Sequence, residues 1–172
     1  MASSKRAEFA DVDNCPRGVE RIGGATHEPF KSSRQSNSQR MIIIKNADEL
    51  KCMRESGRIA ASVRDAVVDR ITPGVTTLEL SEYAGELIEK HGAVSAFLGY
   101  HGYPGIICSS VNEVVVHGIP NDRRIEVGDI VSVDFGVQYN GFIGDTATTV
   151  MVGVTDPEII RLVAVTELAL EK

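Results

Sequence analysis

The chain has 172 residues, of which 42% are hydrophobic and 24% are charged, and its formal net charge is -6. This length and balance suit one globular domain with a tail. Residues 1–40 hold seven Lys or Arg and five Asp or Glu, a net +2, whereas residues 41–172 hold eleven and nineteen, a net -8. An acidic body argues against a nucleic-acid partner, because proteins that bind nucleic acids normally present a basic face.

The cysteines and the apolar segments exclude further classes. Cys15, Cys52 and Cys108 form no CxxC pair, so neither a disulfide framework nor a zinc knuckle is indicated. This usage fits a reducing compartment, and we expect the cytoplasm. No apolar run reaches the ~20 residues that cross a bilayer, and the N-terminus has no apolar core of a secretory signal. A membrane partner is therefore not expected.

Residues 1–40 are predicted to be a disordered N-terminal extension, because they contain few large apolar residues and end in the polar run Lys31–Arg40. The folded part, residues 41–172, is predicted to begin at Met41. The run Met41–Ile44 predicts a short strand or an anchored lead-in.

The first predicted helix begins after Asn46, an N-cap residue with Glu49 at the matching position of a capping box. Apolar residues then recur at helical spacing as far as Ile71. The helix is expected to end there, because Thr72–Gly74 contains a proline followed by a glycine.

The second predicted helix begins at Thr76 or Thr77, with Glu79 completing another capping box. It is expected to end at His91, where Gly92 provides a left-handed cap.

Residues 93–127 are rich in turn residues and contain the short apolar runs Ile106–Cys108 and Val114–Val116, which predict short strands joined by loops. Two clearer strands are predicted at residues 130–137 and 142–152. Asn140-Gly141 lies between them and is a strong signal for a two-residue hairpin turn.

The last predicted helix begins at Asp156-Pro157, a cap residue followed by a proline suited to the first turn. It continues with apolar residues to Lys172.

The hairpin turn brings two carboxylates together. With Asn140-Gly141 as the turn, Gly136 opposes Asp145 and Asp134 opposes Ala147. Asp134 and Asp145 then share one face as diagonal neighbours, roughly 7–8 Å apart at Cα. Two carboxylates at this separation can bind one or two cations between them. On spacing alone, however, a solvated pair on an open sheet face is an equal alternative.

The composition of the two faces favours a cation. One face of the first strand is wholly apolar, and the aspartate face carries small residues that leave room for ions. Two adjacent carboxylates buried without a counter-charge would raise a pKa or destabilise the fold. Divalent cations prefer carboxylate oxygens, so a metal would resolve the conflict.

Five blocks around this pair resemble type I methionine aminopeptidases in order and nearly in spacing. They are Leu98–Pro104 (LGYHGYP), Cys108–Glu113 (CSSVNE), Val116–Pro120 (VHGIP), Gly128–Asp134 (GDIVSVD) and Asn140–Asp145 (NGFIGD). The resemblance begins near Met41 and implies an α+β chain with helices on an antiparallel sheet, the N-terminal half of a pita-bread (creatinase/aminopeptidase-like) fold. It implies metal-dependent removal of the initiator methionine.

The resemblance also implies residue roles. Asp134 matches a ligand that chelates one metal ion, and Asp145 matches a ligand that bridges two; the metals are Co, Mn, Fe or Zn. His117 matches a histidine that contacts the scissile amide and stabilises the tetrahedral intermediate. Tyr100, Tyr103 and Cys108 match residues lining the methionine side-chain pocket. Phe97 stands where some relatives carry a smaller residue, and His101 is given no ligand role.

The same resemblance implies partners. The N-terminal methionine of nascent polypeptides is the expected substrate, and the ribosome and a separate C-terminal half are further candidate partners. The family's remaining ligands are one His and two Glu, but no His follows His117, and the glutamates of the last helix match no ligand motif. We therefore expect a partial domain, truncated at its C-terminus and inactive alone. The alternatives are a non-catalytic binding protein of this fold and a Pro-specific aminopeptidase or prolidase relative.

Overall fold

The structure is a computed structural model that describes residues 44–172. The predicted disordered extension, residues 1–40, and all but the last residue of the Met41–Ile44 run therefore lie outside the described residues. Ile44 itself is exposed and belongs to no helix or strand.

Helix α1 spans Ala47–Val68 and begins as the sequence predicts. The Asn46 side chain accepts hydrogen bonds from two backbone N–H groups of the first turn, and the Glu49 carboxylate accepts from the Asn46 N–H at 2.8 Å. The helix ends three residues before the predicted Ile71. The N–H groups of Arg70 and Ile71 bond to carbonyls three residues back, so the last residues form a tighter turn.

Helix α2 spans Thr77–Lys90 and confirms both of its predicted ends. Thr76 and Glu79 form the capping box at its start. Gly92, with φ of 67°, follows its end in the left-handed region that glycine tolerates best.

The sheet has four antiparallel strands: β1 (Val94–Ser95), β2 (Cys108–Val111), β3 (Ile130–Tyr139) and β4 (Phe142–Met151). Strand β3 is central, with β4 along its whole length on one edge and β1 and β2 pairing with different parts of its other edge. A 3-10 turn, η1 (Tyr100–Gly102), lies between β1 and β2.

The prediction of a strand at Val114–Val116 is wrong, because these residues form no strand and are exposed. Asn112, with φ of 53°, turns the chain away at the end of β2. Its side chain accepts a hydrogen bond from the Ile130 N–H and donates one to Asp129, so the turn is held from both sides. The Ile106–Cys108 run contributes only Cys108 to a strand.

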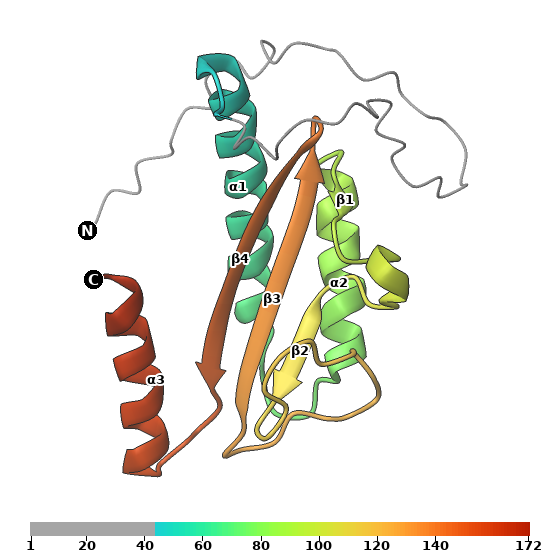
Figure 1. Ribbon diagram of the computed structural model, residues 1–172. Coiled ribbons are helices and arrows are strands. Elements are labelled where there is room, and N and C mark those ends of the chain that lie inside the picture. Colours follow the sequence, from blue (N-terminus) through green and yellow to red (C-terminus); the bar gives the residue numbers. More distant parts are fainter. Residues whose placement is uncertain (1–43) are drawn as a thin grey trace, which may run out of the picture.

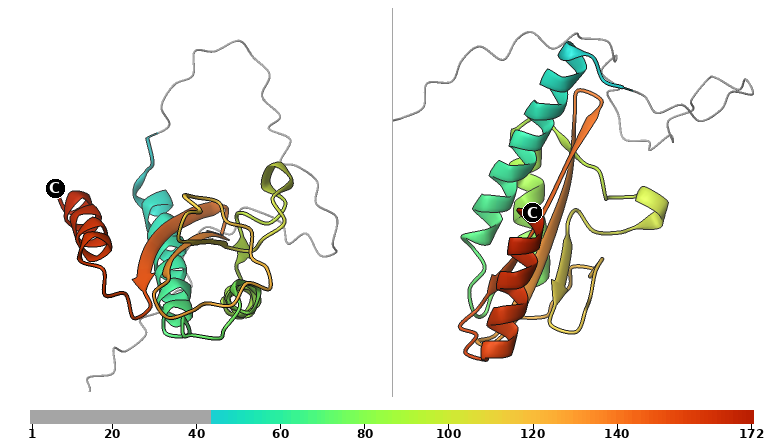
Figure 2. Two further views of the ribbon diagram at one scale, coloured as in Figure 1. Left: turned by 90° about the horizontal axis from the view of Figure 1, so that it is seen from below. Right: turned by 60° about the vertical axis from the view of Figure 1, so that its left-hand side comes forward.

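The fold has two layers, the sheet and the helix pair α1 and α2. The helices cover one face of the sheet and leave the other face without a helix (Figures 1 and 2). Valines and Phe135 from β3 point toward these helices and are fully buried among residues of α1 and α2. Side chains alternate along a strand, so Asp134 lies on the opposite, open face.

Strand β4 approaches α1 unusually closely. A Cβ atom added to Gly144 would lie 2.6 Å from the backbone of Gly57. The buried Ser56 hydroxyl bonds to the Val137 carbonyl at 2.9 Å and the Phe142 carbonyl at 3.0 Å. The helix and the hairpin are therefore joined by backbone contact and by hydrogen bonds to both strands.

Helix α3 spans Pro157–Leu170 and begins at the predicted Asp156 cap. It stands apart from the other helices, to the side of β4 (Figures 1 and 2). Only Val163 is buried on it, and its exposed large apolar residues are Ile160, Leu162, Val165, Leu168 and Leu170. Among residues 44–172, no helix is long and apolar enough to cross a membrane.

Candidate functional site

The β3–β4 hairpin places the two aspartates as the sequence predicts. Asn140 and Gly141 have φ of 48° and 80°, the two positive values of a type I′ turn. In the register that follows, Asp134 opposes Ala147 and Gly136 opposes Asp145. The aspartates are therefore diagonal neighbours on the face away from the helices.

Asp134 lies in an electrostatically unfavourable place. Its side chain is half-buried, and Oδ1 has no hydrogen-bond partner among the described residues. Burial raises the pKa of Asp134, and the carboxylate of Asp145 raises it further, while His117 and the Phe135 N–H oppose this. This direction agrees with the expectation that burying one carboxylate near another raises a pKa, and burial is the larger of the two causes.

Cys108 and Tyr103 form a wall beside Asp134. Cys108 is the cross-strand partner of Asp134 and is buried. Burial raises the pKa of the Cys108 thiol, as do the two aspartates, although a hydrogen bond with Tyr103 opposes this. The Tyr103 hydroxyl donates to the backbone, 2.9 Å from the Gly118 carbonyl and 3.1 Å from that of Ile107. Tyr103 therefore offers the cavity mainly its ring.

His117 lies in the loop after β2, with its side chain exposed at the rim of the aspartate face. Its φ is 56°, which non-glycine residues rarely adopt. The following residue, Gly118, is buried against β2.

One cavity of about 570 Å³ brings together all six residues singled out from the sequence. They are Tyr100, Tyr103, Cys108, His117, Asp134 and Asp145. Its wall also includes His101, Phe97 and Ile119. The sequence reasoning missed Ile119, although it stands two residues after His117 in the same block.

Phe97 packs directly on the strand between the aspartates. A Cβ atom added to Gly136 would overlap the Phe97 ring. Gly136 therefore leaves the space that the Phe97 ring occupies against β3, and Phe97 is part of the cavity wall. His101 has φ of 48° and meets the Tyr100 ring edge-on, with 4.4 Å between ring centroids.

The residues present fit a divalent cation. Two carboxylates converge, and one buried oxygen lacks a partner. A cation would supply that partner and relieve the repulsion. Within residues 44–172, no group of three or more His, Cys, Asp or Glu is arranged to hold a metal ion, so these residues supply a pair of ligands.

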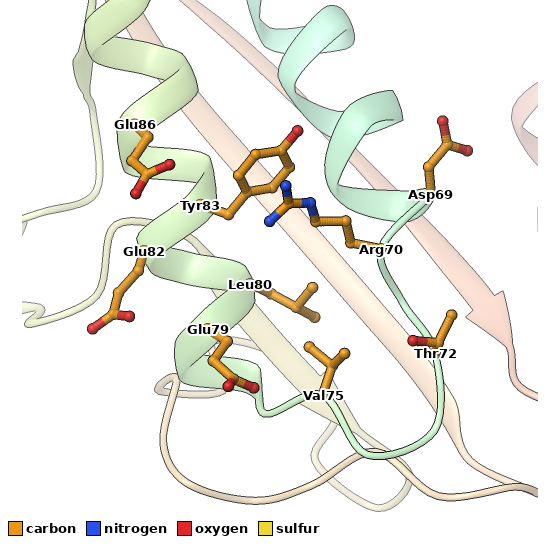
Figure 3. A pocket seen from close by; sticks show the side chains of 9 residues that line it. All are labelled: Asp69, Arg70, Thr72, Val75, Glu79, Leu80, Glu82, Tyr83 and Glu86. Atoms are coloured by element: carbon orange, nitrogen blue, oxygen red, sulfur yellow. The ribbon is translucent and has the colours of Figure 1, made fainter.

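A second cavity, of about 480 Å³, lies between the end of α1 and the start of α2 (Figure 3). The Arg70 guanidinium lies over the Tyr83 ring, 3.4 Å from its centroid. Glu79 belongs to the capping box of α2. This cavity is on the helix side of the sheet, away from the aspartates, and we assign it to the packing of the helix junction.

Replacing Asp134 with asparagine is expected to stabilise the metal-free chain at neutral pH. The pKa of Asp134 is raised in the folded state, so its contribution to stability is favourable below the unfolded pKa and is lost as pH rises through the folded pKa. The gain in stability of Asp134→Asn over the wild-type chain should therefore shrink as pH falls toward 4 and below, where aspartate becomes protonated. Thermal unfolding with a chelator, measured across this range, checks the prediction.

Asp156→Asn is the matched control for that measurement. It removes the same charge from the exposed cap of α3, where asparagine also caps. A stability gain of equal size in both variants would contradict a local cause at Asp134.

Comparison of the sequence with known proteins assigns the chain to a family. The sequence profile of metallopeptidase family M24 matches residues 51–172. The chain belongs to metallopeptidase family M24. This confirms the predicted family relationship and the predicted fold class of helices on an antiparallel sheet.

Two relatives within the M24 family carry the name methionine aminopeptidase. "Methionine aminopeptidase 1" of Bacillus subtilis is 46% identical over 132 residues, which cover 77% of this chain and 53% of that protein. The crystal structure of methionine aminopeptidase from Rickettsia prowazekii is 40% identical with a TM-score of 0.75, over 77% of this chain and 53% of that one. The chain spans about half the length of the curated relatives it matches.

A solved structure with a Pro-specific name is less similar to this chain. Xaa-Pro dipeptidase from Bacillus anthracis is 28% identical with a TM-score of 0.60, over 69% of this chain and 32% of that one. Both measures are lower than for the Rickettsia prowazekii enzyme. The comparison therefore favours methionine aminopeptidases over the Pro-specific alternative.

Proposed function

We propose that this chain supplies one wall and two metal ligands of a methionine aminopeptidase that removes the initiator methionine from nascent polypeptides. The observation that carries the proposal is the convergence of Asp134, Asp145 and His117 on one cavity whose wall is Tyr100, Tyr103 and Cys108. The names of the relatives support the substrate class.

In this proposal Asp134 and Asp145 would hold divalent ions of Co, Mn, Fe or Zn, Asp134 as a ligand of one ion and Asp145 as a ligand shared by two. When bound, such ions polarise a peptide carbonyl and lower the pKa of water. The chain's own residues hold and orient the reacting groups. The raised pKa of Asp134 is consistent with a carboxylate kept for a cation, because a cation would stabilise its charged form.

In the proposal His117 contacts the substrate from the rim of the cavity. Its exposed imidazole lies on the cavity wall with the aspartates. A neutral imidazole there can donate one hydrogen bond to the scissile amide and to the oxyanion that develops from it. In the proposal His117 contacts the reacting amide and does not bind metal.

The methionine side chain binds beside this centre. The Tyr103 hydroxyl is engaged by the backbone, so the ring is the surface it offers. Burial raises the pKa of the Cys108 thiol and so favours its neutral form. Aromatic rings and a neutral sulfur suit a thioether, and the Phe97 ring lines the same cavity.

A chimera tests the proposal. Residues 41–172 would replace the matched half of the Bacillus subtilis relative, and hydrolysis of a Met-Ala peptide and an Xaa-Pro dipeptide would be followed with added Mn²⁺ or Co²⁺. We expect turnover of the Met-Ala peptide only. Preference for Xaa-Pro would support the prolidase-like alternative, and metal binding without turnover of either would support a binding protein.

The 172-residue chain alone is the control in that assay. Its described residues place two carboxylate ligands together, and hard-cation affinity rises with the number of ligands. We expect no turnover of Met-Xaa peptides by this chain alone, and measured turnover would contradict that part of the proposal. The cytoplasm, the ribosome and a separate C-terminal half remain part of the proposal as compartment and partners.

A further inference from the structure

The loop residue Gly118 lies against strand β2 so tightly that only glycine fits. A Cβ atom added to Gly118 would overlap the backbone carbonyl oxygen of Ser109 and would lie 2.9 Å from the Cα of Ser110. Backbone atoms in a strand have little freedom to move aside. The loop carrying His117 is therefore in direct backbone contact with the sheet one residue after the imidazole.

Three hydrogen bonds hold Gly118 in this position. Its N–H donates to the Ser110 hydroxyl at 3.0 Å. Its carbonyl accepts from the Ser109 N–H at 2.9 Å and from the Tyr103 hydroxyl at 2.9 Å. Ser110 is only 4% exposed, so water cannot readily replace its hydroxyl as the acceptor.

This clamp, formed by Ser110, Tyr103 and the Ser109 backbone, determines where His117 can point. His117 has φ of 56°, a backbone conformation that persists only where the surroundings impose it. Because Gly118 is fixed on both its N–H and its carbonyl, the direction in which the His117 side chain leaves the loop is set by the sheet.

We propose that Ser110 is a positioning residue for His117, acting through Gly118 together with Tyr103. Ser110 and Asp134 both belong to paired strands and lie on the same face of the sheet. The clamp thus fixes the position of the His117 loop relative to the strands that carry the aspartates. The inference rests on the proposed catalytic role of His117 and adds two residues that maintain its geometry.

NMR of the full chain tests the clamp without any metal. Ser110→Ala removes the acceptor of the Gly118 N–H, so exchange of that amide should accelerate roughly three- to tenfold, as expected for one lost hydrogen bond. The His117 ring signals should shift or broaden as the imidazole samples new positions. Ser110→Thr keeps a hydroxyl and should restore both signals.

Ser132→Ala is the matched control, because Ser132 is the cross-strand partner of Ser110 and bonds instead to the Thr149 hydroxyl. It should leave Gly118 exchange and the His117 signals unchanged, even if it lowers the melting temperature as much as Ser110→Ala does. The inference is overturned if Ser110→Ala leaves both signals unchanged, or if Ser132→Ala changes them equally. If Ser110→Ala does not fold, Tyr103→Phe removes the other side-chain bond to Gly118 and is judged by the same criteria.

Added Mn²⁺ separates this inference from the proposed function. Paramagnetic Mn²⁺ held by the aspartates should broaden the His117 ring signals strongly in the wild-type chain. In Ser110→Ala the broadening should be weaker and should differ between the ring signals, because the imidazole samples several positions. Absence of broadening in the wild type would count against the proposed metal site while leaving the clamp to be decided by the metal-free signals.

Discussion

Asp145→Asn is expected to weaken binding of divalent metal to this chain by at least about tenfold and to lower turnover by the chimera by at least about 100-fold. Asp145 lies opposite Gly136 in the hairpin, diagonal to Asp134 on the open face of the sheet. Asparagine keeps the size of the side chain but removes its negative charge. It also replaces one of the two carboxylate oxygens by an amide nitrogen, which does not bind a hard cation. Even residues that only support metal ligands are commonly worth 10–100-fold.

The binding half of this prediction can be measured from the free Mn²⁺ signal in electron paramagnetic resonance. Asp134→Asn should give a similar loss, because the proposal makes both carboxylates ligands. Asp156→Asn changes charge by the same amount at the α3 cap and should retain wild-type binding. Equal loss in the Asp156 variant would indicate a general charge effect and contradict a site between Asp134 and Asp145.

Gly144→Ala is expected to destabilise the chain by roughly 1–3 kcal/mol or more, because it overpacks a well-filled interior. The new methyl group would lie 2.6 Å from backbone atoms of Gly57 in α1. Backbone atoms of a helix cannot rotate away as a side chain can, so the hairpin and the helix must separate. That separation would also strain the Ser56 bonds to Val137 and Phe142.

Gly57→Ala is the matched control for Gly144→Ala, since the two glycines lie on either side of one contact. A Cβ atom added to Gly57 meets nothing within 4 Å. Alanine is favoured over glycine inside a helix by about 0.5–1 kcal/mol, so this variant should be neutral or stabilised. Denaturant unfolding of both variants gives the comparison, and a Gly144→Ala variant as stable as Gly57→Ala would refute the close-contact explanation.

The same hairpin therefore serves the core and the site. On one face of β3, valines and Phe135 are fully buried against the helices. On the other face, Asp134 takes its place in the cavity. Because side chains alternate in a strand, a shift of register by one residue would expose the core and bury the aspartates. The apolar face thus helps to keep the two carboxylates in position.

Local signals in the sequence determined most of the helices and the hairpin. Asn46 with Glu49 and Thr76 with Glu79 identified two helix starts, because capping boxes depend on residues three apart. Asn140-Gly141 set the register that pairs Gly136 with Asp145, because a two-residue turn leaves one pairing. The diagonal arrangement of the two aspartates followed from that turn alone.

Long-range contacts decided what the sequence left open. The apolar run Val114–Val116 satisfied the strand pattern, yet the Asn112 turn, bonded to Asp129 and Ile130, directs it to the surface. Phe97 could be placed over Gly136 only once β1 and β3 were paired. The clamp on Gly118 likewise joins residues 103, 109, 110 and 118, which no local pattern connects. Tertiary packing decided these features because each depends on which backbone atoms meet across the sheet.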